Sequence, residues 1–195
     1  MKNILLSLVS GYLIGSIPTG YLLTKLINSK DIRQVGSGST GATNVLRSSG
    51  NKTLALLTLL IDVLKGFIVS ILFINNQYLY LAVVACLIGH VYPIWLKGKG
   101  GKGVATAAGV LLGICPYLTL ISALIWGIVL KRTHISSVAS LSFISSIFIL
   151  VLLTDSSLNL ILLSAGIFGF LCFTHRSNLI RLINHQEKSL NNDKF

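Results

Sequence analysis

Two glycine-rich stretches contain the residue types that bind phosphate. The first, GSGSTGATNVLR (36–47), combines bare backbone with hydroxyls, an amide and a guanidinium. The second, GKGGKGVAT (98–106), alternates glycine with lysine before an apolar run typical of a helix. Glycine lets backbone N–H groups approach a ligand closely, and a helix N-terminus adds its positive end. Each stretch therefore predicts an anion site. For the second, a tight interfacial turn with its lysines toward lipid headgroups is the alternative.

Both stretches also satisfy the G-x-G-x-x-G pattern of dinucleotide sites. That pattern requires a strand before the loop and an acidic residue on a second strand of one parallel sheet. Here the acid at a suitable distance from the first loop, Asp62, lies in an apolar helical run. The second loop has Val104 and Ala105 where a Walker loop has Lys and Ser or Thr. We therefore exclude a nucleotide site.

A third polar segment, THRSNLIRL, spaces His175, Asn178 and Arg181 three residues apart. If the segment is helical, this spacing puts them on one face. The alternative is an ordinary solvated helix surface. His90, in IGHVYP, is compatible with either structural hydrogen bonding or a place in the site. The three cysteines lie far apart inside apolar runs, so we expect buried thiols and no metal site.

The elements that position these loops are membrane helices. The chain has 195 residues, is 53% hydrophobic and only 11% charged, and has a net charge of +11. Such a composition is typical of a membrane protein with basic loops. Bilayer-spanning runs are predicted at about 4–26, 54–74, 78–96, 104–130, 135–153 and 158–175. The fourth contains Pro116, which favours two short helices hinged there.

The basic residues favour seven segments over six. With a break at Pro116 and an outside N-terminus, every Lys and Arg except Lys2 and Lys65 falls on one face, in agreement with the positive-inside rule. The prediction is one all-α polytopic membrane domain over 1–195, with its C-terminus in the cytoplasm. Three cytoplasmic loops, at 27–53, 97–103 and 174–188, contain the motifs.

The second span contains Asp62 and Lys65, which share a helical face. Charges within a bilayer usually face the bundle interior and pair. A mutually neutralising structural pair and a Lys65 that helps to hold an anion both remain open.

The three motifs, in order and spacing, resemble those of the bacterial acyl-phosphate:glycerol-3-phosphate acyltransferases (the PlsY family). GSIPTGYLL and DVLKG fit the same family, and the similarity spans about residues 10 to 188. The resemblance implies a multi-pass enzyme of the bacterial inner membrane. It would transfer a fatty acyl group from acyl phosphate to the 1-hydroxyl of glycerol 3-phosphate, giving lysophosphatidic acid and phosphate for phospholipid biosynthesis. An organic-phosphate transporter is the main alternative, and a scaffold that binds anionic lipid is another.

An acyl phosphate is a reactive mixed anhydride, so positioning matters more than a strong nucleophile. We expect direct attack by the glycerol hydroxyl, no cofactor and no metal. The catalytic prediction comprises Ser37, Asn44, Arg47, His175 and Asn178. The substrate-binding prediction comprises Gly36, Gly38, Thr43, His90, Lys99, Gly100, Gly101, Lys102 and Gly103.

The residues are compatible with two catalytic bases. Either His175 or a substrate phosphate oxygen can act as the base. The chain departs from the family pattern at Ser39, where Asn is usual, and at Ser177, where an acid is common.

Overall fold

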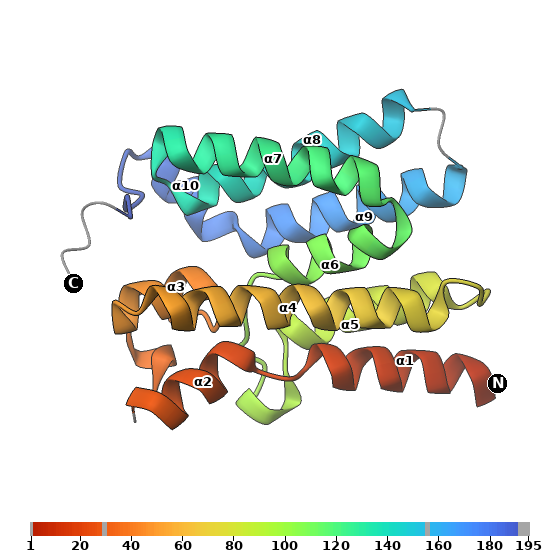
Figure 1. The fold of residues 1–195 in the computed structure, drawn as a ribbon, viewed down its shortest axis with the longest axis horizontal. Coiled ribbons are helices and arrows are strands. Elements are labelled where there is room, and N and C mark those ends of the chain that lie inside the picture. The colour runs from red at the N-terminus through yellow and green to blue at the C-terminus, as the bar shows by residue number, and fades with distance from the viewer. Residues whose placement is uncertain (1, 29–30, 155–156, 191–195) are drawn as a thin grey trace. The chain divides into compact units, whose positions relative to one another are not determined.

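The computed structural model describes residues 2–28, 31–154 and 157–190, and its regular elements in these ranges are all helices (Figure 1). No strand occurs in this described part, so the sheet that a dinucleotide site requires is missing there. The helices are α1 (Lys2–Gly15), α2 (Thr19–Asn28), η1 (Ile32–Gln34), α3 (Ala42–Ser49), α4 (Lys52–Phe73), α5 (Leu79–Val91), η2 (Ile94–Leu96), α6 (Val104–Ile114), α7 (Pro116–Thr133), α8 (Ser136–Leu153), α9 (Leu158–Thr174) and α10 (Arg176–Ile183).

The helices form two compact units, one ending at Ile114 and one beginning at Cys115. The boundary coincides with the break predicted at Pro116. Proline has no N–H to donate, and here it is the first residue of α7. That the chain forms a single domain stays a prediction.

In the first unit, α1 packs along α5 and α4 packs along α6. Small residues make the α1–α5 approach close. A Cβ placed on Gly11 or Gly15 would collide with the backbone of Ala82 or Cys86. Such small-residue contacts are the usual way that membrane helices approach each other closely. In Figure 1, α1 begins at the same end of this unit as the α4–α5 turn, and α2 and α3 lie at the opposite end.

The first apolar run, which we predicted as a span over 4–26, contains two helices. α1 ends at Gly15 and α2 begins at Thr19, with Pro18 in the break. Lys65 of α4 donates a hydrogen bond from Nζ to the Ile17 carbonyl at this break (3.1 Å). The same ammonium forms an ion pair with Asp62 (2.8 Å), and both side chains are at least 95% buried. The buried pair therefore also satisfies backbone that the break exposes.

In the second unit, α8 packs against α7 and α9. Phe148 of α8 stacks on Phe168 of α9 with ring centroids 5.3 Å apart. His134 ends α7 in the left-handed conformation (φ 55°), and its carbonyl accepts the N–H of Leu190 (2.8 Å). This hydrogen bond joins the chain after α10 to the α7–α8 turn.

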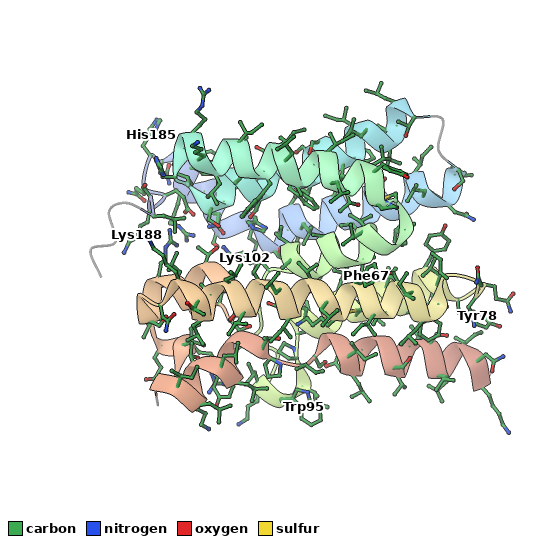
Figure 2. The ribbon with its side chains drawn as sticks, in the orientation of Figure 1. Phe67, Tyr78, Trp95, Lys102, His185 and Lys188 are labelled. Carbon is green, nitrogen blue, oxygen red and sulfur yellow. The ribbon has the colours of Figure 1, made fainter. Side chains whose placement is uncertain are left out.

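Four helical stretches of the described chain are long and apolar enough to cross a membrane: Lys2–Ile27, which contains α1 and α2, Lys52–Phe73, Leu79–Leu96, which contains α5 and η2, and Ser136–Leu153. Counting Leu158–Thr174 with Arg176–Ile183, which are bent by 63°, gives up to five. Figure 2 shows apolar side chains projecting outward along the helices, and exposed Trp95 is one of them. Seven segments and an outside N-terminus stay predictions.

Candidate active site

Asn44 organises the first glycine loop. Its Nδ2 lies within hydrogen-bond distance of the carbonyls of Ile32 (3.2 Å), Val35 (3.0 Å) and Ser39 (2.8 Å). Its Oδ1 accepts the Ser37 N–H (2.9 Å), and the side chain is buried. We expected Asn44 to donate to a substrate oxyanion. Instead, its amide is used in holding the loop, so it positions Ser37.

Two glycines give this loop its tight path. Gly36 and Gly38 have positive φ (61° and 70°), a region that favours glycine. Gly36 also lies against the Asn44 side chain, where a Cβ would collide with Oδ1. The Ser39 hydroxyl accepts the Gly41 N–H (3.3 Å), so a polar side chain is useful at the position where the sequence departs from the family.

The second glycine loop is closed by its own backbone. The N–H groups of Gly98, Lys99, Gly100 and Gly101 donate to the carbonyls of Pro93, Leu96, Val91 and His90 at 3.0–3.2 Å. We expected successive amides of this stretch to bind an anion. Because these four already have carbonyl partners, the anion-binding elements that remain are the lysines and the start of α6, whose first N–H groups have no partner within the helix.

His90 lies directly beneath this loop. Its Nδ1 is 3.0 Å from the Thr106 hydroxyl and 3.7 Å from the Asp62 carboxylate. A Cβ at Gly101 would collide with its Nε2. Of the two roles left open for His90, the observed contacts are structural: it supports the loop from below.

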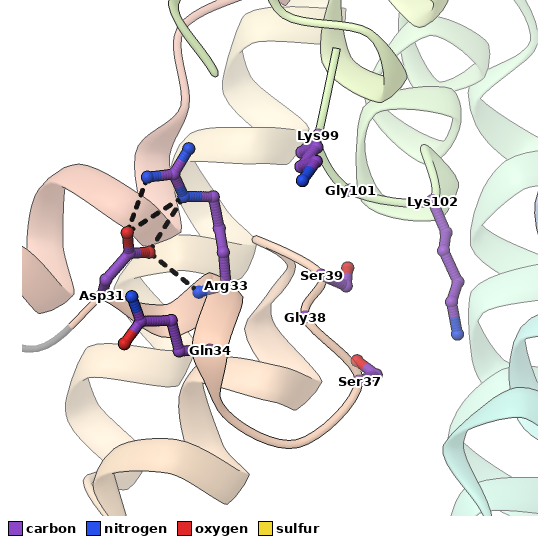
Figure 3. A pocket seen from close by; sticks show the side chains of 10 residues that line it. Asp31, Arg33, Gln34, Ser37, Gly38, Ser39, Lys99, Gly101 and Lys102 are labelled. Carbon is purple, nitrogen blue, oxygen red and sulfur yellow. Dashed lines mark hydrogen bonds and ion pairs between the residues drawn. The ribbon is translucent and has the colours of Figure 1, made fainter. Parts of the chain in front are cut away.

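The two loops meet. The Thr40 N–H donates to the Gly100 carbonyl (3.3 Å). Together they border an open cavity of about 490 Å³ within the first unit (Figure 3), lined by Asp31, Arg33, Gln34, Ser37, Gly38, Ser39, Lys99, Gly100, Gly101 and Lys102. Its lining contains three cations and one carboxylate, with two hydroxyls. Such a lining suits anionic oxygens.

The sequence prediction missed Asp31, Arg33 and Gln34 in this lining. Asp31 caps η1 by accepting the Arg33 N–H, and its carboxylate also binds the guanidinium, with the shortest contact at 2.6 Å. The Arg33 hydrogen bond, assisted by its charge, lowers the pKa of Asp31 to about 2. An Asp and an Arg two residues apart, just before a glycine loop, were the available signal.

In the second unit, His175 caps the start of α10 and is buried. Its Nδ1 lies 2.8 Å from the Leu171 carbonyl. Since a carbonyl only accepts, Nδ1 carries the proton, and in the neutral ring the lone pair is then on Nε2. This tautomer suits a proton acceptor.

Glu187 joins three polar residues of the second unit. Asn178 Nδ2 and Arg181 Nε each donate to it at 2.6 Å, and Ser137 Oγ donates at 2.8 Å. Burial by itself would raise the pKa of Glu187, but these hydrogen bonds and the Arg181 charge hold it below its ordinary value. The predicted one-face arrangement of Asn178 and Arg181 is therefore observed, with a carboxylate as their common partner.

The structure thus places the predicted residues in three groups. Ser37, Gly38 and Lys99 to Lys102 line the cavity. Gly36, Thr43, Asn44, Arg47, His90 and Gly103 lie in or behind the elements that form it, and Arg47 follows Asn44 by one turn of α3. His175 and Asn178 belong to the second unit. Within the described ranges, no group of three His, Cys, Asp or Glu residues is placed to hold a metal ion.

Comparison with known proteins gives one consistent result. The glycerol-3-phosphate acyltransferase family model matches residues 5–185. A glycerol-3-phosphate acyltransferase of Pelagibacter ubique is 42% identical over 184 residues, covering 92% of this chain and 93% of that protein. One of Prochlorococcus marinus is 45% identical over 190 residues, covering 94% of this chain and 92% of that protein.

Solved structures agree with this. PlsY (YgiH), an integral membrane glycerol 3-phosphate acyltransferase, matches in its glycerol 3-phosphate form with a TM-score of 0.91 and 34% identity, over 96% of each chain. Its lysophosphatidic acid form matches with a TM-score of 0.88 and 32% identity, over 96% of this chain and 95% of that one.

Proposed function

The chain belongs to the glycerol-3-phosphate acyltransferase family, and from that premise we propose that it uses an acyl phosphate as its donor. It is an acyltransferase of phospholipid biosynthesis that acylates the 1-hydroxyl of glycerol 3-phosphate to give lysophosphatidic acid. The finer parts of the proposal are the donor, the assignment of residues, and a catalytic site on the cytoplasmic side of a bacterial inner membrane.

The observation that carries the proposal is the shared cavity. Two substrates that each contain a phosphate need a site with two sets of anion-binding groups close together. The cavity offers Ser37 and Ser39 from one loop and Lys99 and Lys102 from the other, and the loops are joined by a backbone hydrogen bond. The proposal assigns the acyl phosphate to the first loop and glycerol 3-phosphate to the second.

The reaction needs no enzyme nucleophile. The 1-hydroxyl oxygen bonds to the acyl carbon, the bond from that carbon to the phosphate oxygen breaks, and phosphate leaves with the electron pair. The hydroxyl proton passes either to Nε2 of His175 or to a phosphate oxygen. Ser37 and Arg47 stabilise the negative charge that develops on the acyl oxygen and the leaving phosphate. Asn44 holds Ser37 in place, and Asn178 is held by Glu187.

The test is an assay on the purified protein in liposomes. Palmitoyl phosphate is supplied with and without glycerol 3-phosphate, and released phosphate and lysophosphatidic acid are measured. We expect both products only when glycerol 3-phosphate is present, in equal amounts. Release of phosphate that does not depend on glycerol 3-phosphate, or no release from a folded preparation, contradicts the proposal.

The same preparation tests the transporter alternative. Liposomes with the protein in their bilayer and no substrate in their lumen are given labelled glycerol 3-phosphate without acyl donor. A transporter accumulates the label inside, whereas the enzyme leaves it outside. Liposomes without protein are the control.

A further inference from the structure

Arg33 lies in the cavity but belongs to neither glycine loop. It comes from η1, and its guanidinium is on the same side of the cavity as Lys99 (Figure 3). Its side chain is 29% exposed, so it is accessible from the cavity without being fully solvated. The reaction proposed above gives it no role.

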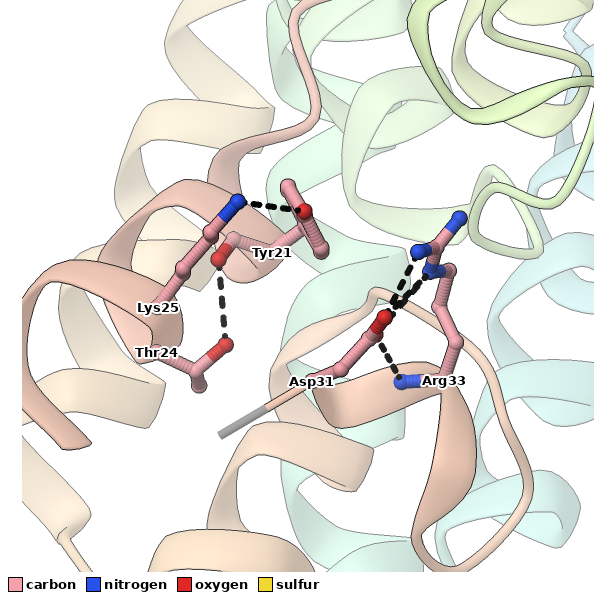
Figure 4. Close-up of polar contacts among 5 residues, drawn as sticks. All are labelled: Tyr21, Thr24, Lys25, Asp31 and Arg33. Atoms are coloured by element: carbon pink, nitrogen blue, oxygen red, sulfur yellow. Dashed lines mark hydrogen bonds and ion pairs between the residues drawn. The ribbon is translucent and has the colours of Figure 1, made fainter. Parts of the chain in front are cut away.

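The guanidinium is fixed from two sides (Figure 4). The Asp31 carboxylate accepts hydrogen bonds from Nε (2.9 Å) and Nη2 (2.6 Å) of the guanidinium. Its Oδ1 also accepts the Arg33 backbone N–H at 3.0 Å. The Tyr21 ring lies under the guanidinium, with its centroid 5.0 Å from Cζ. A cation held in this way loses less conformational freedom when it binds a ligand.

Asp31 does not use all the donors of Arg33. A guanidinium has five N–H groups arranged in a planar fork, and a carboxylate covers only one edge. Nη1 has no hydrogen-bond partner among the residues that the structure describes, so the outer edge remains available. That edge, with two nitrogens side by side, suits two oxygens of one phosphate.

The surroundings of Arg33 favour the lipid substrate over the soluble one. Tyr21 belongs to α2, and Lys25, one turn later, donates to the Tyr21 hydroxyl (3.1 Å). Elsewhere on α2, Leu22, Leu26 and Ile27 are 43%, 81% and 58% exposed. Helices with one polar face and exposed apolar residues typically lie at the membrane interface. Arg33 therefore lies where a polar cavity adjoins an apolar helix, and only a substrate with an acyl chain matches both.

We propose that Arg33 is a substrate contact whose outer guanidinium edge binds the phosphate of the acyl phosphate, with Asp31 and Tyr21 as positioning residues. This rests on the proposed function, because it selects one of that reaction's two substrates. Asp31 has two opposite effects on phosphate binding, because it neutralises part of the Arg33 charge but also orients the guanidinium. Loss of Asp31 therefore weakens binding less than loss of Arg33 itself.

Steady-state kinetics of the full-length protein test this, with each substrate varied at a saturating level of the other. Arg33→Gln is expected to raise the KM for palmitoyl phosphate at least about tenfold, equivalent to about 1.4 kcal/mol, and to leave the KM for glycerol 3-phosphate within about twofold. Arg33→Lys keeps the charge but loses the fork, so an intermediate rise is expected. Arg132→Gln, an exposed arginine at the end of α7, is the matched control and should match wild type.

Asp31→Asn tests whether Asp31 acts by positioning the Arg33 guanidinium. We expect it to raise the same KM about threefold, and the double variant Asp31→Asn with Arg33→Gln to be no worse than Arg33→Gln alone. Additive effects of the two substitutions on this KM would overturn the positioning role.

An inhibition measurement covers the case in which Arg33→Gln does not fold. Palmitoyl phosphonate, which cannot transfer its acyl group by loss of phosphate, is used as a competitive inhibitor of wild type and Arg33→Lys. A several-fold weaker inhibition of Arg33→Lys supports the contact. Unchanged inhibition, an unchanged KM for palmitoyl phosphate, or equal increases in both KM values overturn it. An inactive wild type would reject the proposed function, whereas an active wild type with insensitive Arg33 variants would reject this inference alone.

Discussion

Single residues in the second glycine loop are selected by packing. Gly101 lies on the His90 ring, and Gly100 lies against the His90 and Val91 carbonyls and Pro93, where a Cβ would collide in each case. Both donate their N–H groups to backbone carbonyls. These glycines therefore allow the loop to lie flat on the end of α5 and so present the two lysines to the cavity.

Gly101→Ala is expected to displace His90 or the loop. Overpacking of this kind costs about 1–3 kcal/mol, and we expect catalytic efficiency to fall at least tenfold, mainly through the KM for glycerol 3-phosphate. Thermal unfolding in detergent and steady-state kinetics measure the two effects. Gly127→Ala in α7 is the control, because a Cβ there meets nothing within 4 Å and alanine favours a helix. Equal behaviour of the two variants would contradict this account.

Asp31 gives a pH dependence with a definite sign. Because its pKa falls from 3.8 in the unfolded chain to about 2 in the fold, the unfolded chain binds more protons between these values. The contribution of the ion pair to stability is therefore complete above about pH 5 and is lost as the pH falls toward 2. Asp31→Asn should lower the free energy of unfolding by up to about 1 kcal/mol at pH 6, as for a partly exposed pair. The difference should vanish near pH 2. Unfolding monitored by circular dichroism across this range would refute the assignment if the difference were constant.

At the scale of elements, the α1–α2 break depends on a charge in α4. Lys65 reaches across to the Ile17 carbonyl while paired with Asp62, and His90 of α5 and Thr106 of α6 complete the buried cluster. Three helices, α4, α5 and α6, thus share one polar centre with the α1–α2 break. The structural reading of the Asp62–Lys65 pair is the one that these contacts support.

Removing one charge of this pair is expected to cost more than removing both. Lys65→Met leaves a buried carboxylate and an unpaired carbonyl, so we expect a loss of about 3–5 kcal/mol. Adding Asp62→Asn should recover part of it. A thermal unfolding cycle in detergent measures the coupling, with Lys52→Met at the exposed start of α4 as the neutral control. Strictly additive losses would show that the two side chains are not coupled.

At the scale of the whole molecule, the positions of the basic residues predict the membrane orientation. Seven segments put residue 2 outside and residues 131 and 188 in the cytoplasm, whereas six segments put residue 131 outside. The helix break at Pro116 is compatible with the seven-segment prediction.

Cysteine labelling distinguishes these arrangements. With Cys86, Cys115 and Cys172 replaced, single cysteines at Lys2, Lys131 and Lys188 are treated with an impermeant maleimide in intact cells and again after lysis. We expect Lys2→Cys to react in intact cells, and the other two only after lysis. Labelling of Lys131→Cys in intact cells would favour six segments.

Sequence patterns predicted the features that depend on local chemistry. Pro116 identified a break because its ring removes a hydrogen bond. Pro18 is the same type of signal, but the hydrophobic run continues past it, so the sequence analysis did not predict a break there. The amide partners of Gly98–Gly101 were not predictable, because they depend on backbone brought together only by folding. Asp31 and Arg33, just before the first glycine loop, were a signal that the prediction did not use.

The closed backbone of the second glycine loop has a consequence for the energetics of recognition. Four hydrogen bonds fix Gly98 to Gly101 against the end of α5 without any ligand. The entropy of ordering this loop is thus lost when the protein folds, and none of that loss falls on the binding step. If Lys99 and Lys102 hold glycerol 3-phosphate as proposed, their contacts contribute to affinity without a compensating loss of backbone freedom, and few groups are then enough to hold a small, highly hydrated substrate.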